Sequence, residues 1–276
     1  MRHHTEIIDY FIDCQRRGVL SHAYLFVGSA GSGVSEVVSE VVHVLTPGEV
    51  ISVVPQLPEK GKSTVLRIRV DQIRTLKEYL SGSSLKEGLR VVRMQETELM
   101  DEGAGNALLK VLEEAPAQTM FLIEVGSADV LLPTIISRCQ VMRVGLVSDE
   151  VVNEILTTSG VTDEGERAEC IQMCAGRAGF ARMMATNKKV RTEWLKKWRA
   201  LQEITRAPLA VQLKSGTKLD AIEELLLETV LHHDLQRADG GLQMKTGRVA
   251  GLMAARRAVS VNVPSATAFE QVWIGV

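Results

Sequence analysis

Residues 23–35 read Ala-Tyr-Leu-Phe-Val-Gly-Ser-Ala-Gly-Ser-Gly-Val-Ser, an apolar run that leads into a loop with three glycines. The apolar residues at its start predict a buried strand, and the pattern over residues 36–44 predicts a helix directly behind the loop. A glycine-rich turn between a strand and a helix is typical of phosphate-binding loops, in which backbone N–H groups and the helix N-terminus surround phosphate oxygens. The stretch therefore indicates an α/β fold organised around such a turn.

The loop keeps the shape of a phosphate-binding motif but not its charge. Gly28, Gly31 and Gly33 supply the backbone cradle, and Ser35 supplies the hydroxyl that holds magnesium in working loops. The position beside Gly33, where such loops carry a lysine to neutralise the β- and γ-phosphates, is Val34. Two interpretations remain open: a tight connection without a ligand, or weak residual nucleotide binding at Gly28, Gly31, Gly33 and Ser35.

A second charged group is missing at the end of the strand predicted over residues 89–94. Hydrolysing sites of this class use an Asp there to reach the magnesium, followed by an acidic residue that orients water. This chain has Gln95 and Glu96, and a neutral amide is a poor ligand for a hard cation. Because the lysine and the Asp are replaced together, we expect no ATP turnover and interpret Glu96 as a structural remnant.

The rest of the first half alternates apolar runs with helical patterns. A helix is predicted over residues 102–114, and the Pro-containing residues 47–62 are the most loop-like stretch. Strands separated by helices predict a parallel sheet. After about residue 147 the apolar stripes have helical spacing only, as at residues 219–230 and 249–259, which predicts an all-α remainder. Besides residues 23–27, the predicted strands are residues 65–70, 89–94, 120–125 and 140–144.

The overall composition is that of an ordinary globular protein. With 276 residues the chain suggests two or three domains, and 45% hydrophobic residues are enough for a packed core. A formal net charge of −2 argues against a protein that coats nucleic acid with its whole surface. The start of the chain lacks a signal-peptide pattern, and no apolar run approaches the ~18 residues of a membrane span. We therefore expect a cytoplasmic protein without a membrane partner.

Two clusters suggest a ligand but favour a structural role. Cys170 and Cys174 could share a helix face, yet no second ligand pair lies elsewhere, so we expect buried thiols and no metal. The basic residues 188–199 contain two tryptophans that could stack on nucleic-acid bases. Since Trp194 and Trp198 lie on the same helical face as other apolar residues, core packing is the favoured interpretation.

Specific segments occur in order along the first half. They are Ser-His-Ala-Tyr-Leu-Phe at residues 21–26, Asp-Gln-Ile-Arg at 71–74, Asn-Ala-Leu-Leu-Lys-Val-Leu-Glu-Glu-Ala-Pro at 106–116 and Leu-Leu-Pro-Thr-Ile-Ile-Ser-Arg-Cys-Gln at 131–140. Over residues 15–145 the chain resembles the delta-prime subunits of bacterial DNA polymerase III clamp loaders, which are AAA+ proteins. Residues 176–182 resemble the lid motif of that family, and residues 259–272 weakly resemble the end of its collar domain.

The resemblance implies three domains. They are an AAA+ α/β domain with a five-stranded parallel sheet at residues 1–147, a small helical lid at residues 148–187 and an all-α oligomerisation collar at residues 188–276. The family's sheet order makes the third and fourth predicted strands neighbours. We therefore expect an ion pair between Arg93 and Glu124, the charged residues that interrupt these two strands.

The Ser-Arg-Cys motif of the family falls on Ser137, Arg138 and Cys139. Its arginine reaches across a subunit boundary to ATP bound by the neighbour, where a guanidinium stabilises charge that develops on the transferred phosphoryl group. The resemblance thus implies that Arg138 is an arginine finger in trans and that Ser137 and Cys139 support the motif. An isolated arginine after a turn is usually a surface residue, but the surrounding ten-residue motif favours the finger.

The resemblance also implies a non-hydrolysing subunit of the DNA polymerase III holoenzyme that supports ATP-dependent loading of the sliding clamp onto primed DNA. Its partners would be gamma/tau-type ATPase subunits, which bind the ATP, and a delta-type subunit, with clamp and primer-template DNA contacted through the complex. Such subunits usually carry a four-cysteine zinc module, but residues 46–66 contain no cysteine, so no zinc is expected. Two alternatives remain: an active clamp-loader ATPase with an unusual loop, or a DNA-repair or structural scaffold with the same fold.

Overall fold

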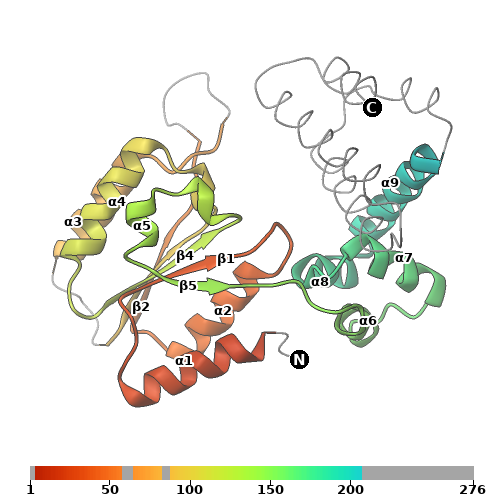
Figure 1. Ribbon diagram of the computed structural model, residues 1–276, viewed down its shortest axis with the longest axis horizontal. Helices are drawn as coiled ribbons and strands as arrows, with labels where there is room; N and C mark the ends of the chain where they lie inside the picture. Colours follow the sequence, from red (N-terminus) through yellow and green to blue (C-terminus); the bar gives the residue numbers. More distant parts are fainter. Residues whose placement is uncertain (1–3, 58–64, 83–87, 207–276) are drawn as a thin grey trace, which may run out of the picture. The chain divides into compact units, whose positions relative to one another are not determined.

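The computed structural model of the chain describes residues 4–57, 65–82 and 88–206 (Figure 1). The chain forms two compact units. Of the described residues, the first unit comprises those up to residue 147 together with residues 177–180, and the second comprises residues 148–176 and 181–206. The first unit contains every strand that the structure describes.

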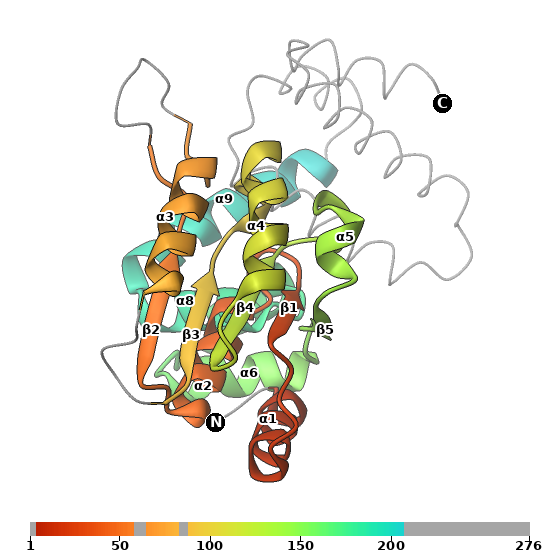
Figure 2. The ribbon, with the colours of Figure 1, turned by 90° about the vertical axis from the view of Figure 1, so that its left-hand side faces the viewer.

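The first unit is built on a fully parallel, five-stranded sheet with the strand order β2-β3-β4-β1-β5. Figure 2 shows the strands side by side in this order. Because β1 lies between β4 and β5, the loop that follows β1 leaves the sheet from an inner strand. The strands are β1 (Ala23–Val27), β2 (Glu49–Val53), β3 (Arg90–Met94), β4 (Thr119–Val125) and β5 (Gln140–Arg143).

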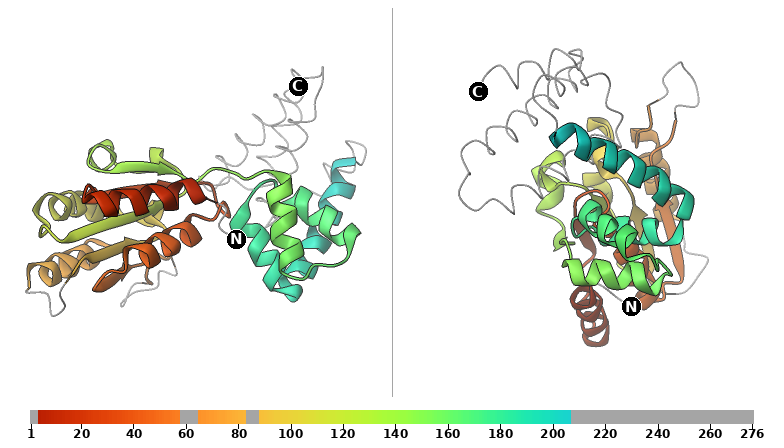
Figure 3. Two further views of the ribbon diagram at one scale, coloured as in Figure 1. Left: turned by 90° about the horizontal axis from the view of Figure 1, so that it is seen from below. Right: turned by 90° about the vertical axis from the view of Figure 1, so that its right-hand side faces the viewer.

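Helices cover both faces of this sheet, which explains why its inner strands are mainly apolar. Alternate residues of β1 enter two different cores, since Tyr24 and Phe26 pack with α1 and α2 while Leu25 packs with α3, α4 and α5. Short 3₁₀ turns lie at Thr97–Leu99 and Ala128–Val130. On one face lie α1 (Thr5–Arg17) and α2 (Val34–Leu45), and on the other lie α3 (Val70–Ser81), α4 (Glu102–Glu114) and α5 (Pro133–Ile136) (Figures 1 and 3).

Most of the sequence-based expectations for this unit are confirmed. The sheet is parallel and five-stranded, and four of its strands lie where the apolar runs predicted them. The predicted helix over residues 102–114 is α4, and the predicted helix behind the glycine-rich loop is α2.

The prediction of a strand over residues 65–70 is wrong. Arg67 and Ile68 make only isolated bridges. The Arg69 N–H donates to Oε1 of Gln72 over 3.0 Å, as part of the cap of α3. The strand beside β3 is instead β2, inside the stretch that was predicted to be a loop. β2 is an edge strand whose residues alternate between partly buried and exposed, so it lacks the continuous apolar run of a central strand.

Among the residues that the structure describes, the second unit contains helices joined by short turns and no strand. Trp198 is buried and Trp194 is partly buried, so the tryptophans of the basic segment pack inward, as predicted. Cys170 and Cys174 are buried too, and neither is in a disulfide. The helices are α6 (Asp149–Thr158), α7 (Glu164–Cys174), α8 (Ala178–Thr186) and α9 (Lys188–Arg206).

Several expectations concern residues outside the described ranges. They include the helical stripes at residues 219–230 and 249–259 and the collar similarity at residues 259–272. The lid and collar boundaries at residues 148–187 and 188–276 therefore stay predictions. Within the ranges that the structure describes, no helix is both long enough and apolar enough to cross a membrane.

Candidate functional site

The glycine-rich loop connects the end of β1 to the start of α2. Gly31 and Gly33 have φ angles of +78° and +103°, a region that residues with a Cβ rarely adopt. Gly28 is needed for space, because a Cβ there would lie 2.8 Å from the carbonyl oxygen of Val144. The structure thus brings Gly28, Gly31, Gly33 and Ser35 into one turn, with Gly33 immediately before the first residue of α2.

The chain's own groups pack closely against this turn. Ser32 is completely buried, and its Oγ has no hydrogen-bond partner among the described residues. Phe180, in the short segment that belongs to the first unit, donates its N–H to the carbonyl oxygen of Gly31 over 2.9 Å. Gly179 lies so near that a Cβ on it would be 3.0 Å from the Cα of Gly33. The glycines therefore serve close packing as well as the shape of the loop.

Arg93 of β3 extends from the sheet to α2. Its Nε donates to Oε1 of Glu124 on β4 over 2.5 Å, which confirms the predicted ion pair. Its Nη2 donates to the carbonyl oxygen of Ser35 over 2.9 Å and to the Ser35 Oγ over 2.7 Å, and its Nη1 donates to the Oγ of Ser39 over 3.0 Å. The side chains of Arg93 and Glu124 are only 15% and 7% exposed, so both charges are largely removed from water.

The hydroxyl of Ser35 is the centre of this network. Besides the bond from Arg93, it accepts a hydrogen bond from Nε2 of Gln95 over 3.4 Å. The Arg93 guanidinium and, to a smaller degree, the Ser35 hydroxyl lower the pKa of the Glu124 carboxyl. Burial is the largest effect, however, and it holds the pKa of Glu124 above its ordinary value.

Arg138 lies at the surface, between α5 and β5. Its Nε and Nη2 donate to Oε1 of Glu113 at the end of α4, over 3.0 and 2.5 Å, and its Nη1 donates to the carbonyl oxygen of Thr134 over 3.0 Å. The side chains of Arg138 and Glu113 are 37% and 51% exposed. The guanidinium is thus held in one orientation by groups that remain open to solvent.

The residues beside Arg138 have structural roles. The hydroxyl of Ser137 donates to the carbonyl oxygen of Thr134 over 3.1 Å, which closes the short turn after α5. Cys139 packs against the core between the sheet and α3, α4 and α5, and burial raises the pKa of its thiol to about 11. A thiol with that pKa stays neutral at physiological pH, so Cys139 contributes packing and no charge.

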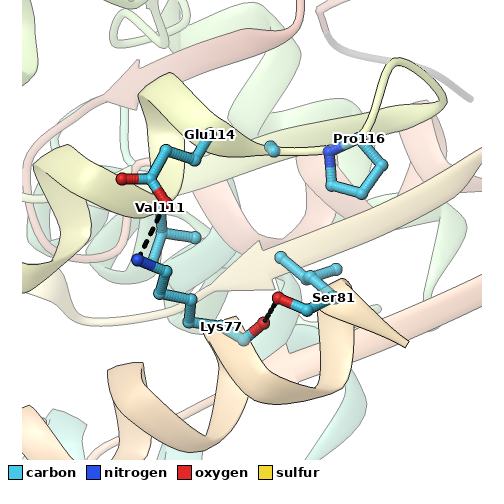
Figure 4. A pocket seen from close by; sticks show the side chains of 7 residues that line it. Lys77, Ser81, Val111, Glu114 and Pro116 are labelled. Carbon is cyan, nitrogen blue, oxygen red and sulfur yellow. Dashed lines mark hydrogen bonds and ion pairs between the residues drawn. The ribbon is translucent and has the colours of Figure 1, made fainter.

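A small surface cavity lies between α3 and α4, on the sheet face opposite to α2 (Figure 4). The ammonium of Lys77 and Oε2 of Glu114 pair across it at 2.8 Å, and the contact lowers the pKa of Glu114. Its volume of about 50 Å³ is far below the ~300–1,000 Å³ of typical ligand sites. We therefore assign no ligand to it.

Sequence reasoning missed two contacts of the site. Glu113 and Arg138 are 25 residues apart, and no local pattern links them. The contact between Arg93 and Ser35 had a usable signal, because Arg93 stands two residues before Gln95 and side chains two apart in a strand share a face.

Comparison with known proteins shows which proteins the chain is similar to. The family model described as "DNA polymerase III, delta subunit" matches residues 49–147. The delta' subunit of DNA polymerase III from Haemophilus influenzae is 37% identical over 120 residues, which cover 44% of this chain and 36% of that protein. Over these segments the chain is similar to delta-prime subunits of DNA polymerase III. The Escherichia coli delta' subunit is 28% identical over 207 residues, covering 71% of this chain and 58% of that protein.

More distant relatives and solved structures extend the comparison. The tau subunit of DNA polymerase III from Bacillus subtilis is 30% identical over 134 residues, covering 44% of this chain and 24% of that protein. The Thermotoga maritima RuvB Holliday junction branch migration motor superposes with a TM-score of 0.51 at 14% identity, covering 95% of this chain and 82% of that chain. This likeness shows the fold alone. The matches span 36% and 58% of the two delta-prime relatives named above, so they cover only part of those proteins.

Proposed function

We propose that this chain is a non-hydrolysing, delta-prime-type subunit of a DNA polymerase III clamp loader and that it donates Arg138 to the ATP site of a neighbouring gamma/tau-type subunit. The observation that carries the proposal is the state of the chain's own turn, where Arg93 and Gln95 engage Ser35 and Val34 replaces the lysine. The similarity to proteins named as delta' and tau subunits of DNA polymerase III supports the choice of complex.

A magnesium nucleotide does not fit the residues at this turn. Nucleotide sites of this kind neutralise the phosphates with a lysine and hold magnesium through hydroxyl and carboxylate oxygens. Val34 carries no charge, the hydroxyl of Ser35 is engaged within the chain, and Gln95 offers an amide. We therefore assign no reaction step to the turn itself.

Arg138 has the accessibility that a guanidinium acting in trans requires. Its carboxylate partner, Glu113, is half-exposed, and an exposed ion pair of this kind is worth only about 0–1 kcal/mol. Phosphate oxygens, which accept charge-assisted hydrogen bonds from guanidinium groups as carboxylates do, can replace that carboxylate at little cost. A guanidinium supplied in trans contributes about 10³–10⁵ in rate to phosphoryl transfer.

In this proposal the complex supplies the remaining activities. The gamma/tau-type subunits bind and hydrolyse ATP, and a delta-type subunit completes the assembly. The sliding clamp and primer-template DNA are contacted through the complex. The isolated chain is not an enzyme, and its contribution to catalysis is Arg138, with Ser137 and Cys139 holding the turn in which that residue lies.

The test is the ATPase activity, stimulated by clamp and primed DNA, of a loader reconstituted from this chain with gamma/tau-type and delta-type subunits. Arg138→Ala is compared with the natural chain, with omission of the chain, and with Arg17→Ala, which removes another exposed arginine paired with a carboxylate, Asp13. We expect Arg138→Ala to assemble normally and to slow turnover at the neighbouring site by about 10³-fold or more. Arg17→Ala is expected to keep full turnover.

The other outcomes decide between the alternatives. Equal turnover with the natural chain, with Arg138→Ala and without the chain rules out the finger. ATP hydrolysis by the isolated chain favours an active clamp-loader ATPase. A folded chain that does not associate with gamma/tau-type subunits favours a scaffold outside the loader.

A further inference from the structure

We infer that Arg93 is a built-in cation that takes the place of magnesium at the turn and excludes a divalent ion from it. The inference deepens the non-hydrolysing part of the proposed function and rests on that part alone. It does not involve Arg138, a neighbouring subunit or DNA, so the isolated chain can test it.

The first argument is the bonding capacity of the Ser35 hydroxyl. A hydroxyl has two acceptor lone pairs and one donor hydrogen. Arg93 Nη2 donates to this oxygen over 2.7 Å, and Gln95 Nε2 donates to it over 3.4 Å. Both lone pairs therefore accept hydrogen bonds from within the chain, so neither remains for a metal ion.

The second argument is charge and distance. Magnesium binds oxygen ligands at about 2.0–2.1 Å and demands near-octahedral geometry. The guanidinium of Arg93 already lies against the same oxygen and cannot lose its charge, because arginine is not deprotonated in proteins. A divalent ion at Ser35 would therefore face direct repulsion from a cation that is only 15% exposed.

The third argument is that Arg93 is fixed in this position. Glu124 on β4 neutralises it, and Ser39, one turn further along α2, accepts from its Nη1 over 3.0 Å. Turning the guanidinium away would break these bonds and leave the largely buried carboxylate of Glu124 unpaired. Restoring the two missing groups of an ATPase site is thus insufficient while Arg93 stays.

The experiment compares two engineered forms of the full chain. The restored form carries Val34→Lys and Gln95→Asp, and the cleared form adds Arg93→Val and Glu124→Ala to these changes. Affinity for a fluorescent ATP analogue is measured by anisotropy with magnesium and with EDTA. We expect magnesium to leave the affinity of the restored form unchanged and to raise that of the cleared form about tenfold or more, the worth of one charge-assisted contact. Ser35→Ala in the cleared form serves as the control and is expected to abolish that rise.

Each result has a defined meaning. A magnesium-dependent rise in the restored form overturns the inference and leaves the proposed function standing. Hydrolysis of magnesium ATP by the natural chain overturns the non-hydrolysing proposal itself. Circular dichroism shows whether the cleared form folds. If it does not, Arg93→Gln and Glu124→Gln are used in place of Arg93→Val and Glu124→Ala, because glutamine is close in size to both natural side chains. A folded cleared form without the rise also overturns the inference.

Discussion

Arg138 and Glu113 are joined through a single carboxylate oxygen, since Nε and Nη2 of the arginine lie 3.0 and 2.5 Å from Oε1 of the glutamate. The two residues belong to separate motif segments, one at the end of α4 and the other just before β5. Because Glu113 is half-exposed, it holds the guanidinium in one direction without burying it. The same carboxylate competes with any phosphate that Arg138 would bind.

Replacing the Glu113 carboxylate, which competes with phosphate for Arg138, should therefore leave Arg138 active as the arginine finger. In the reconstituted loader we expect Glu113→Gln to keep the stimulated ATPase rate or raise it by up to about fivefold, because an exposed ion pair is worth about 0–1 kcal/mol. The neighbouring Glu114→Gln is the matched control, since Glu114 pairs with Lys77 and not with Arg138. A loss of turnover as large as that of Arg138→Ala would instead mean that Glu113 is required to orient the guanidinium.

Removing Arg93 should make stability depend strongly on pH. Burial already raises the pKa of Glu124 above its ordinary 4.5, and Arg93 opposes that rise. In Arg93→Met the pKa of Glu124 rises further, so the folded protein holds a proton that the unfolded chain releases above about 4.5. Stability then falls as pH increases between the unfolded and folded pKa values. We expect a loss of about 3–5 kcal/mol in unfolding free energy at neutral pH and a clearly smaller loss near pH 5.

Urea denaturation of the full chain at the two pH values measures this difference. Arg93→Met combined with Glu124→Met is the control, because it removes both charges and should recover much of the stability and lose the extra pH dependence. Equal destabilisation by Arg93→Met at both pH values would show that Glu124 does not depend on Arg93 for its charge.

The sequence predicts the inner sheet and its helices because these elements have strong local signals. β1, β3 and β4 are buried on both faces, so each lies in a mainly apolar run that sequence patterns detect, even though Arg93 and Glu124 interrupt β3 and β4. β2 is half-covered at the sheet edge, and its identity depends on pairing with β3 rather than on its own composition. The alternation at residues 65–70 resembled a strand, but Arg69 and Gln72 form a helix cap there instead.

The sequence also predicts the parts of the candidate site that have local signals. Glycine spacing locates the turn, and the missing charges at Val34 and Gln95 are visible in the sequence. The ion pair between Arg93 and Glu124 followed from the neighbouring strands. What the sequence did not reveal is that Arg93 also binds Ser35, because that contact depends on how closely α2 packs on the sheet.

Cys139 should react slowly although it follows an exposed arginine. Burial raises the pKa of its thiol to about 11, so the reactive thiolate is scarce at mildly alkaline pH. We expect iodoacetamide near pH 8.5 to modify Cys139 about 100-fold more slowly in the folded chain than in urea, as followed by peptide mass spectrometry. A similar rate in both states would mean that the turn after α5 opens readily and exposes the thiol.

The glycine-rich turn should be sensitive to a single methyl group where its backbone is left-handed. Gly33 has a φ of +103°, and in Gly33→Ala we expect a loss of about 1–2 kcal/mol in unfolding free energy from backbone strain. Gly145→Ala is the control, because a Cβ there meets no atom within 4 Å and its φ is not in the left-handed region. That variant should be unchanged or up to about 1 kcal/mol more stable, through the reduced entropy of its unfolded chain. Denaturant midpoints of the two variants measure the difference, and equal midpoints would show that the turn relaxes to accept the methyl group.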